Sequence, residues 1–203
     1  MKWDLICKHV SKNIPNFKIE IKEKSSLMRI LSYILFFNKR FRTQFITTLY
    51  PVVYFPKQIL SNPDEVGRVI ILSHEYVHLK DKKRLGILFD LLYLSPQIFS
   101  LLAVLAIWFS NDWLWFLLFL LPLPSPRAYF EFRAYKMSIA VHYFIMGKIP
   151  LLDFYINQFT SSNYYWMFPF QKMLHKHFFE FTLRLRKKQY EDYIEEIKNV
   201  INS

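Results

Sequence analysis

Residues 74–78 read His-Glu-Tyr-Val-His, a pattern that brings its two histidines together only on a helix. On an α-helix, residues i and i+4 lie on one face about one turn apart. His74 and His78 can therefore bind one zinc ion through ring nitrogens, leaving positions for a third protein ligand and a water molecule. Zinc lowers the pKa of such a water, and the carboxylate of Glu75 can accept its proton. The alternative is a surface helix with two unrelated histidines.

The residues before this pattern contain the signals that start a helix. Asn62 is a candidate N-cap, Pro63 suits the first helical position, and Glu65 falls at the third. We expect the helix to run from Pro63 to about Arg84, with both histidines in its interior. The local signals therefore agree with the conformation that the spacing of the histidines requires.

The segments upstream of this helix predict a small β-sheet. Residues 17–24 alternate apolar and charged side chains, which is typical of a half-buried strand. Residues 43–55 are rich in β-branched and aromatic side chains and are broken by a proline, so we expect one or two short strands there. A helix from Ser25 or Ser26 to about Phe37 would lie between them. A strand commonly lies beside the site of zinc peptidases and pairs with extended substrate; the alternative is an ordinary sheet edge.

Residues 86–126 contain two long apolar stretches separated by a polar tip. The first, residues 88–109, is long enough as a helix to span a hydrocarbon core of about 30 Å. The second, residues 113–123, is shorter, so we expect a partial span or a re-entrant segment. The alternative is a helical hairpin buried in a soluble core, because Asp90 and Pro96 interrupt the first stretch.

Basic residues flank both ends of this apolar hairpin. The positive-inside rule places both flanks in the cytoplasm. We therefore expect the helix with the two histidines to lie at the cytoplasmic face of a membrane. The flanking residues are Lys80, Lys82, Lys83 and Arg84 before the hairpin, and Arg127, Arg133 and Lys136 after it.

The composition narrows the class of partner. The chain has 27 Lys and Arg against 16 Asp and Glu, a net charge of +11, and 19% aromatic residues. This combination indicates nucleic acid or an anionic membrane. No helix-turn-helix, zinc-knuckle or RNP-like pattern is present, so we expect an anionic membrane and no nucleic acid. Cys7 is the single cysteine, which excludes a disulfide framework. The N-terminus, which begins Met-Lys-Trp-Asp, lacks the long apolar run of a signal peptide, so we do not expect export by that route.

The last third of the chain predicts basic amphipathic helices. In residues 168–203, apolar side chains recur at helical spacing on one face, with basic side chains on the others. Such a segment suits an anionic surface, and equally a helix packed on the catalytic domain with its charged face in water. The expected apolar face consists of Met173, Leu174, Phe178, Phe181 and Leu185.

A catalytic zinc site usually has three protein ligands, so two histidines leave one ligand to be found. The candidates are acidic residues after the apolar hairpin, and Glu131 stands out among them. We expect it on a helix that begins near Ser125 and Pro126. Ala134 lies three residues later on roughly the same face, and its small side chain would let this helix approach the histidine-bearing helix closely.

The order of HExxH, a short basic stretch, an apolar hairpin and then E-x-x-A resembles the integral-membrane gluzincins. That family includes the bacterial heat-shock membrane protease and the zinc-dependent CAAX prenyl protease. The resemblance covers about residues 60–140 and implies a zincin-like fold. It also implies that His74, His78 and Glu131 are the zinc ligands and that Glu75 is the general base.

The chain departs from this family at two points. Tyr135 occupies the place of an aspartate that follows E-x-x-A in the family, and the upstream transmembrane helices of full-length members are missing. Asp81, one turn beyond His78, is a candidate for the support that the aspartate would give to a ligand. The sequence is also similar to small bacterial and phage proteins with HExxH and a downstream E-x-x-A, which makes a phage or virion-associated protein the alternative.

Several further residues are candidates for the site. His142 lies eleven residues after Glu131, three helical turns along, where an imidazole can stabilise a tetrahedral oxyanion; the alternative is a structural histidine. Tyr76 and Tyr135 are additional candidates for the same role. The remaining histidines are His175 and His177, expected on the surface, and His9, which has no informative context.

Together these features predict a mainly helical α+β chain, a minimal zincin-like domain. Its parts are residues 1–85 with the strands and the HExxH helix, residues 86–126 with the hairpin, and residues 127–203 with the third ligand and the C-terminal helices. The expected function is a zinc-dependent metalloendopeptidase at the cytoplasmic membrane face, acting on a protein or peptide substrate through zinc-activated water and Glu75. The alternative is a non-catalytic, membrane-associated scaffold or assembly protein that retains the fold.

Overall fold

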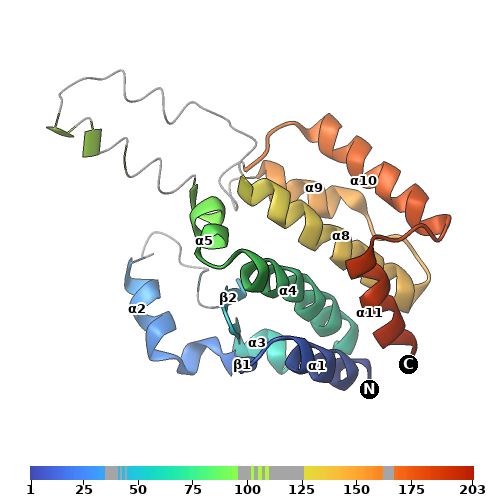
Figure 1. Ribbon diagram of the computed structural model, residues 1–203, viewed down its shortest axis with the longest axis horizontal. Helices are drawn as coiled ribbons and strands as arrows, with labels where there is room; N and C mark the ends of the chain where they lie inside the picture. Colours follow the sequence, from blue (N-terminus) through green and yellow to red (C-terminus); the bar gives the residue numbers. More distant parts are fainter. Residues whose placement is uncertain are drawn as a thin grey trace.

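The helix that carries residues 74–78 lies in the middle of the computed structural model (Figure 1). This helix, α4 (Glu65–Leu85), packs against α8 (Pro126–Met146) on one side and α1 (Lys2–Asn13) on the other. The helix predicted to carry Glu131 is present, and its described part runs from Pro126. The helix that positions the two histidines is therefore supported from both sides.

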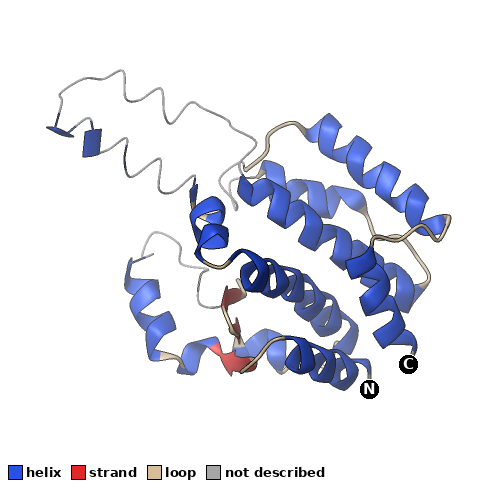
Figure 2. Cartoon of the chain, in the orientation of Figure 1, coloured by secondary structure: helices blue, strands red, loops and turns tan. Residues whose placement is uncertain are grey.

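The structure describes residues 1–34, 41, 43, 45–95, 102, 105–106, 108–109, 126–161 and 167–203. It is mainly helical with one three-stranded sheet, as the sequence predicts (Figure 2). The remaining elements, in chain order, are β1 (Lys18–Ile21), the 3-10 helix η1 (Lys22–Lys24), α2 (Ser26–Ile34), β2 (Thr47–Leu49), β3 (Val52–Phe55), α3 (Lys57–Leu60), α5 (Ile87–Tyr93), α9 (Leu152–Thr160), α10 (Gln171–Arg186) and α11 (Asp192–Asn202).

The ends of α4 are set by an acidic cap and a glycine. The Asp64 side chain accepts a hydrogen bond of 3.0 Å from the Gly67 amide, so Asp64 is the N-cap and the prediction of Asn62 is wrong by two residues. Asn62 instead accepts a bond of 2.9 Å from the Asp64 amide. At the other end Gly86 has φ 58°, a left-handed conformation that glycine adopts at little cost, and the helix stops there.

The small sheet has the order β1-β3-β2 and places β2 at an edge. β1 is parallel to β3, whereas β2 is antiparallel to it, with Thr48 opposite Val53. The prediction of one or two strands in residues 43–55 is confirmed, because β2 and β3 both fall there. The predicted strand over residues 17–24 is shorter than expected, because the chain turns into η1 after Ile21.

Lys22, directly after β1, forms hydrogen bonds with residues 41–47, which lead into β2. Its Nζ donates to the carbonyl oxygens of Phe41 and Phe45 at 2.7 and 3.0 Å and to the Thr47 hydroxyl at 2.7 Å. The side chain is only 1% exposed, and burial lowers the pKa of its amine to about 8. An ammonium group has three protons to donate, and all three find acceptors here. The start of the edge strand is therefore fixed by a buried lysine.

One continuous hydrophobic core joins the first helices to the last. On α10, four of the five residues of the predicted apolar face are buried, while Met173 is half exposed. α10 packs against α9 and α8, and α11 packs against α1 and α8. Core side chains include Ile6 and Val10 of α1, Leu72 and Val77 of α4, Ile139 of α8, Phe178 and Phe181 of α10, and Ile194 and Ile197 of α11.

The prediction of a transmembrane helix requires correction. Among the helices of the described residues, none has the length and apolar character needed to cross a membrane. The expected first span begins as α5, a seven-residue helix that ends at Tyr93 and whose Asp90 pairs with Lys82. Most of the expected hairpin beyond it, including residues 113–123, lies outside the described residues. The expected location at the cytoplasmic face of a membrane depended on that span, so this prediction is wrong as well.

Replacing Lys22 with methionine should destabilise the fold. Lys22→Met keeps an unbranched apolar side chain but leaves the three acceptors without their donor, so we expect the free energy of unfolding to fall by about 1–3 kcal/mol. Urea denaturation followed by circular dichroism measures this change. Lys18→Met, at an exposed position of β1, is the matched control. Equal unfolding midpoints for the two variants would contradict the role assigned to Lys22.

Candidate metal centre

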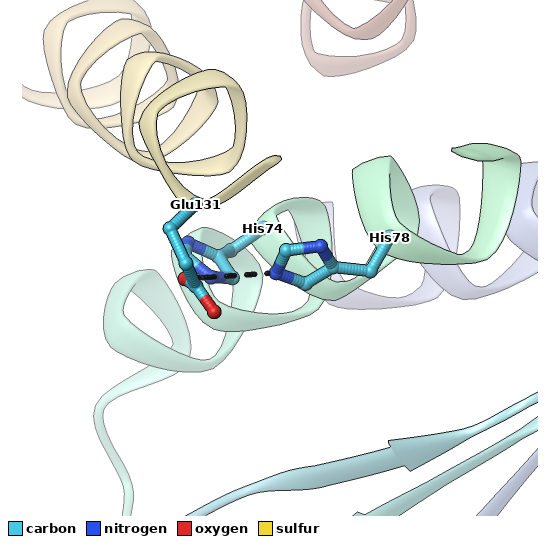
Figure 3. Close-up of side chains that lie close together, drawn as sticks. All are labelled: His74, His78 and Glu131. Carbon is cyan, nitrogen blue, oxygen red and sulfur yellow. Dashed lines mark ion pairs between the residues drawn. The ribbon is translucent and has the colours of Figure 1, made fainter. Parts of the chain in front are cut away.

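Three side chains from two helices converge at the crossing of α4 and α8. His74 and His78 come from α4 and Glu131 comes from α8 (Figure 3). Glu131 Oε2 lies 3.4 Å from His74 Nε2 and 3.7 Å from His78 Nε2. Ligand atoms of all three residues lie within 4.8 Å of one another. The structure thus brings together the three residues that the sequence suggests as metal ligands.

α4 and α8 can approach each other because a small residue lies on the face of α8 that meets α4. Ala134 is fully buried, as its predicted role in helix approach requires. Glu131, Ala134 and Ser138 are spaced three or four residues apart, so they share the face that meets α4. A larger side chain at position 134 would push the Glu131 carboxylate away from the histidines.

The cluster is buried, and its charges compensate one another. Side-chain exposure is 13% for His74, 8% for His78 and 4% for Glu131. Burial alone would raise the pKa of Glu131, but His78 and His74 hold it well below its usual value. Burial likewise disfavours the charged form of His78, while the Glu131 carboxylate outweighs it and raises the pKa of that ring. A cation that binds between these groups would meet an ionised carboxylate.

Ser138 fixes the orientation of the His74 ring. The Ser138 hydroxyl donates to the carbonyl oxygen of Ala134 at 3.3 Å, so its lone pair is available to accept from His74 Nδ1, 3.2 Å away. A proton on Nδ1 leaves Nε2, the nitrogen that faces Glu131, free to bind a metal. The sequence analysis missed Ser138, although its position seven residues after Glu131 places it two helical turns along on the same face.

Tyr93 contacts two residues of the cluster, Glu131 and His78. Its hydroxyl donates to Glu131 Oε1, and its ring lies edge-on to that of His78 at 5.6 Å. Burial and the nearby Glu131 carboxylate raise the pKa of Tyr93 well above its usual value, so the phenol stays a neutral donor. The sequence analysis missed Tyr93, because it lies within the apolar stretch of residues 88–109 and its partner Glu131 is far along the chain.

Glu75 is next to His74 on α4 and contacts the sheet. Its Oε2 accepts a hydrogen bond of 2.6 Å from Thr48 of β2. The carboxylate is therefore oriented by the edge strand, while the backbone of α4 keeps it next to His74. The edge strand β2 therefore lies beside the helix that carries the cluster.

Of the residues proposed as additional site groups, Asp81 and Tyr76 have hydrogen-bond partners outside the cluster, and Tyr135 packs against it. Asp81 accepts a hydrogen bond from Arg133, and His78 Nδ1 has no hydrogen-bond partner among the described residues. Asp81 therefore acts on His78 through its charge, which helps to raise the pKa of that ring, and not through a hydrogen bond. The Tyr76 hydroxyl donates to Glu196 at 2.7 Å, which points it away from the cluster and argues against an oxyanion role. Tyr135 packs its ring against His74 at 4.7 Å.

His142 is distant from the three ligands along α8. Eleven residues of helix separate it from Glu131, a rise of about 16 Å. Its Nδ1 donates to the carbonyl oxygen of Lys148 at 2.9 Å, which suits a structural histidine. Of the remaining histidines, His175 and His177 are exposed as predicted, and His9 pairs with Glu196 at 2.7 Å. The geometry therefore does not support His142 as an oxyanion donor.

The cluster fits zinc in donor type and in spacing. Two imidazole nitrogens and one carboxylate oxygen form a donor set used by catalytic zinc sites. Tetrahedral zinc with bonds of about 2.0–2.1 Å separates its ligand atoms by about 3.3–3.4 Å. The distances of 3.4 and 3.7 Å between Glu131 Oε2 and the two ring nitrogens are close to that value.

Metal content should depend on the three clustered residues. We expect about one zinc per chain in the wild type and its loss in His78→Ala and Glu131→Ala, since two ligands rarely hold zinc tightly. His175→Ala, which removes an exposed histidine, is the control and should retain the metal. Elemental analysis of purified protein, with circular dichroism to verify folding, measures the result. Retention of zinc by both folded ligand variants would rule out this centre.

Ser138→Ala should weaken zinc binding without abolishing it. The variant loses the acceptor for His74 Nδ1, and loss of such a partner typically costs 10–100-fold in metal affinity. Competition with a chromophoric chelator measures the affinity. Ser73→Ala is a matched control, because Ser73 is a buried serine beside His74 whose hydroxyl has no partner among the described residues. A similar loss in both variants would assign the effect to packing rather than to the hydrogen bond.

Comparison of the chain with known protein families, with curated proteins and with solved structures gives no match. Inferences about its function therefore depend on the geometry of the described residues, above all on the cluster of His74, His78 and Glu131.

Proposed function

We propose that the chain is a zinc-dependent metalloendopeptidase of the gluzincin type, with a minimal zincin-like fold. The proposal is carried by one observation: His74, His78 and Glu131 present ligand atoms within 4.8 Å of one another, with Glu75 beside them. Two histidines from one helix and a glutamate from a second helix are the ligand set by which gluzincins are recognised. The resemblance in the sequence and the geometry of the described residues support the same assignment.

Each residue of the cluster has a definable part in such a reaction. Zinc held by the three ligands acts as a Lewis acid and lowers the pKa of a water molecule that it binds. Glu75 takes up a proton during the reaction, and Thr48 orients its carboxylate. Ser138 holds the His74 ring with Nε2 directed to the metal position. The chain thus offers a base and a metal position on adjacent residues of one helix.

The edge strand supports a peptide as the substrate. Within the described residues β2 pairs with β3 alone, which leaves its other edge for an added strand. An extended peptide that pairs with a sheet edge gains main-chain hydrogen bonds whatever its sequence. Because Thr48 of β2 contacts Glu75, a peptide along this edge would pass the proposed base. An endopeptidase needs such a site, since it binds its substrate on both sides of the cleaved bond.

Glu75→Gln should abolish peptide hydrolysis and preserve the metal. Glutamine keeps the shape of the side chain but cannot accept a proton, and general-base catalysis typically contributes 10²–10⁴-fold to the rate. Cleavage of a peptide library by zinc-loaded protein, read by mass spectrometry, gives the comparison.

Glu195→Gln, at an exposed position of α11, is the control for this test and should remain active. Equal cleavage by wild type and Glu75→Gln would exclude the assigned mechanism. A wild type that binds zinc but cleaves nothing would instead indicate a non-catalytic protein that retains the metal centre.

A further inference from the structure

The two oxygens of the Glu131 carboxylate have different surroundings. Oε2 faces the histidines, 3.4 Å from His74 Nε2 and 3.7 Å from His78 Nε2. Oε1 instead accepts the hydrogen bond that Tyr93 donates. One oxygen is thus directed to the metal position, and the other is occupied by a phenol.

Tyr93 is held firmly in the position from which it donates. Its ring stacks on Phe89 at 5.4 Å and meets the His78 ring edge-on at 5.6 Å. The Arg127 guanidinium lies 4.9 Å from the ring centre. Phe89 is itself buried and packs against Phe130, the neighbour of Glu131. Contacts from α4, α5 and α8 therefore fix the direction of the hydroxyl.

We propose that Tyr93 is a positioning residue that makes Glu131 a ligand through Oε2 alone. This inference rests on the proposed function, because it concerns how the proposed zinc ion is bound. A free carboxylate can bind a metal through one oxygen or through both, and the second mode fills a further coordination position. A hydrogen bond from a phenol occupies a lone pair of Oε1 and turns that oxygen away from the ion.

The consequence is an open coordination position. A catalytic zinc site uses three protein ligands and keeps a fourth position for water or substrate. With Glu131 bound through Oε2, the two histidines and one oxygen supply three ligand atoms. Without the Tyr93 bond, Oε1 can also bind the ion, which raises the coordination number to five and crowds the position that the substrate needs. Tyr93 therefore acts on the reaction through Glu131 and does not itself touch the metal.

The test replaces zinc with cobalt, whose visible absorption weakens as its coordination number rises from four to five. Tyr93→Phe keeps the ring contacts with Phe89 and His78 and removes only the hydroxyl. We expect the cobalt form of this variant to absorb more weakly than that of the wild type. X-ray absorption of the zinc form should show an additional oxygen neighbour.

Tyr155→Phe is the matched control, because Tyr155 is a buried tyrosine of α9 whose ring packs against Tyr135, 5.7 Å away. Its spectrum should match that of the wild type. Unchanged coordination in Tyr93→Phe, or the same change in both variants, would overturn the role of Tyr93 while leaving the metal centre in place. A folded wild type that binds neither cobalt nor zinc would overturn the proposed function itself.

Discussion

The burial of one carboxylate between two helices is the constraint on which the rest of the site depends. Glu131 is 3% exposed, and an isolated buried charge would cost several kcal/mol. Two imidazoles and a phenol surround it, so α4, α5 and α8 must all be in place before the charge is compensated. This arrangement links the packing of the helices to the electrostatics of the centre. A cation bound between these groups would compensate the Glu131 carboxylate directly.

Much of the site could be predicted because it depends on local periodicity. His74 and His78 are four residues apart, and this spacing alone places them on one face of a helix. Glu131 followed by Ala134 gave the second helix, since a small residue one turn after an acidic one allows close approach. The helix start was placed within two residues, and the error has a physical origin: Asn62 and Asp64 both accept backbone hydrogen bonds near the terminus. Only the second of them caps the first turn.

The parts that could not be predicted depend on contacts between distant segments. Lys22 continues an alternating pattern that assigns it to the polar face, yet three acceptors from residues 41–47 make its burial favourable. Tyr93 has no local signal, because its partner lies 38 residues away. The apolar stretch was interpreted as a membrane span from its hydrophobic length and its flanking basic residues, whereas α5 ends after seven residues. Composition and length do not reveal where a helix stops.

The network around Glu196 has a consequence for how the chain folds. Glu196 of α11 receives hydrogen bonds from His9 of α1 and from Tyr76 and Lys80 of α4, contacts that span 187, 120 and 116 residues. Helical proteins usually fold fast because their contacts are local. In this chain, by contrast, the loops between α1, α4 and α11 must close before the contacts of Glu196 can form. We therefore expect α4 to reach its final packing only after these long loops have closed. Folding should be slower than in a helical bundle of similar size that is stabilised by neighbouring helices.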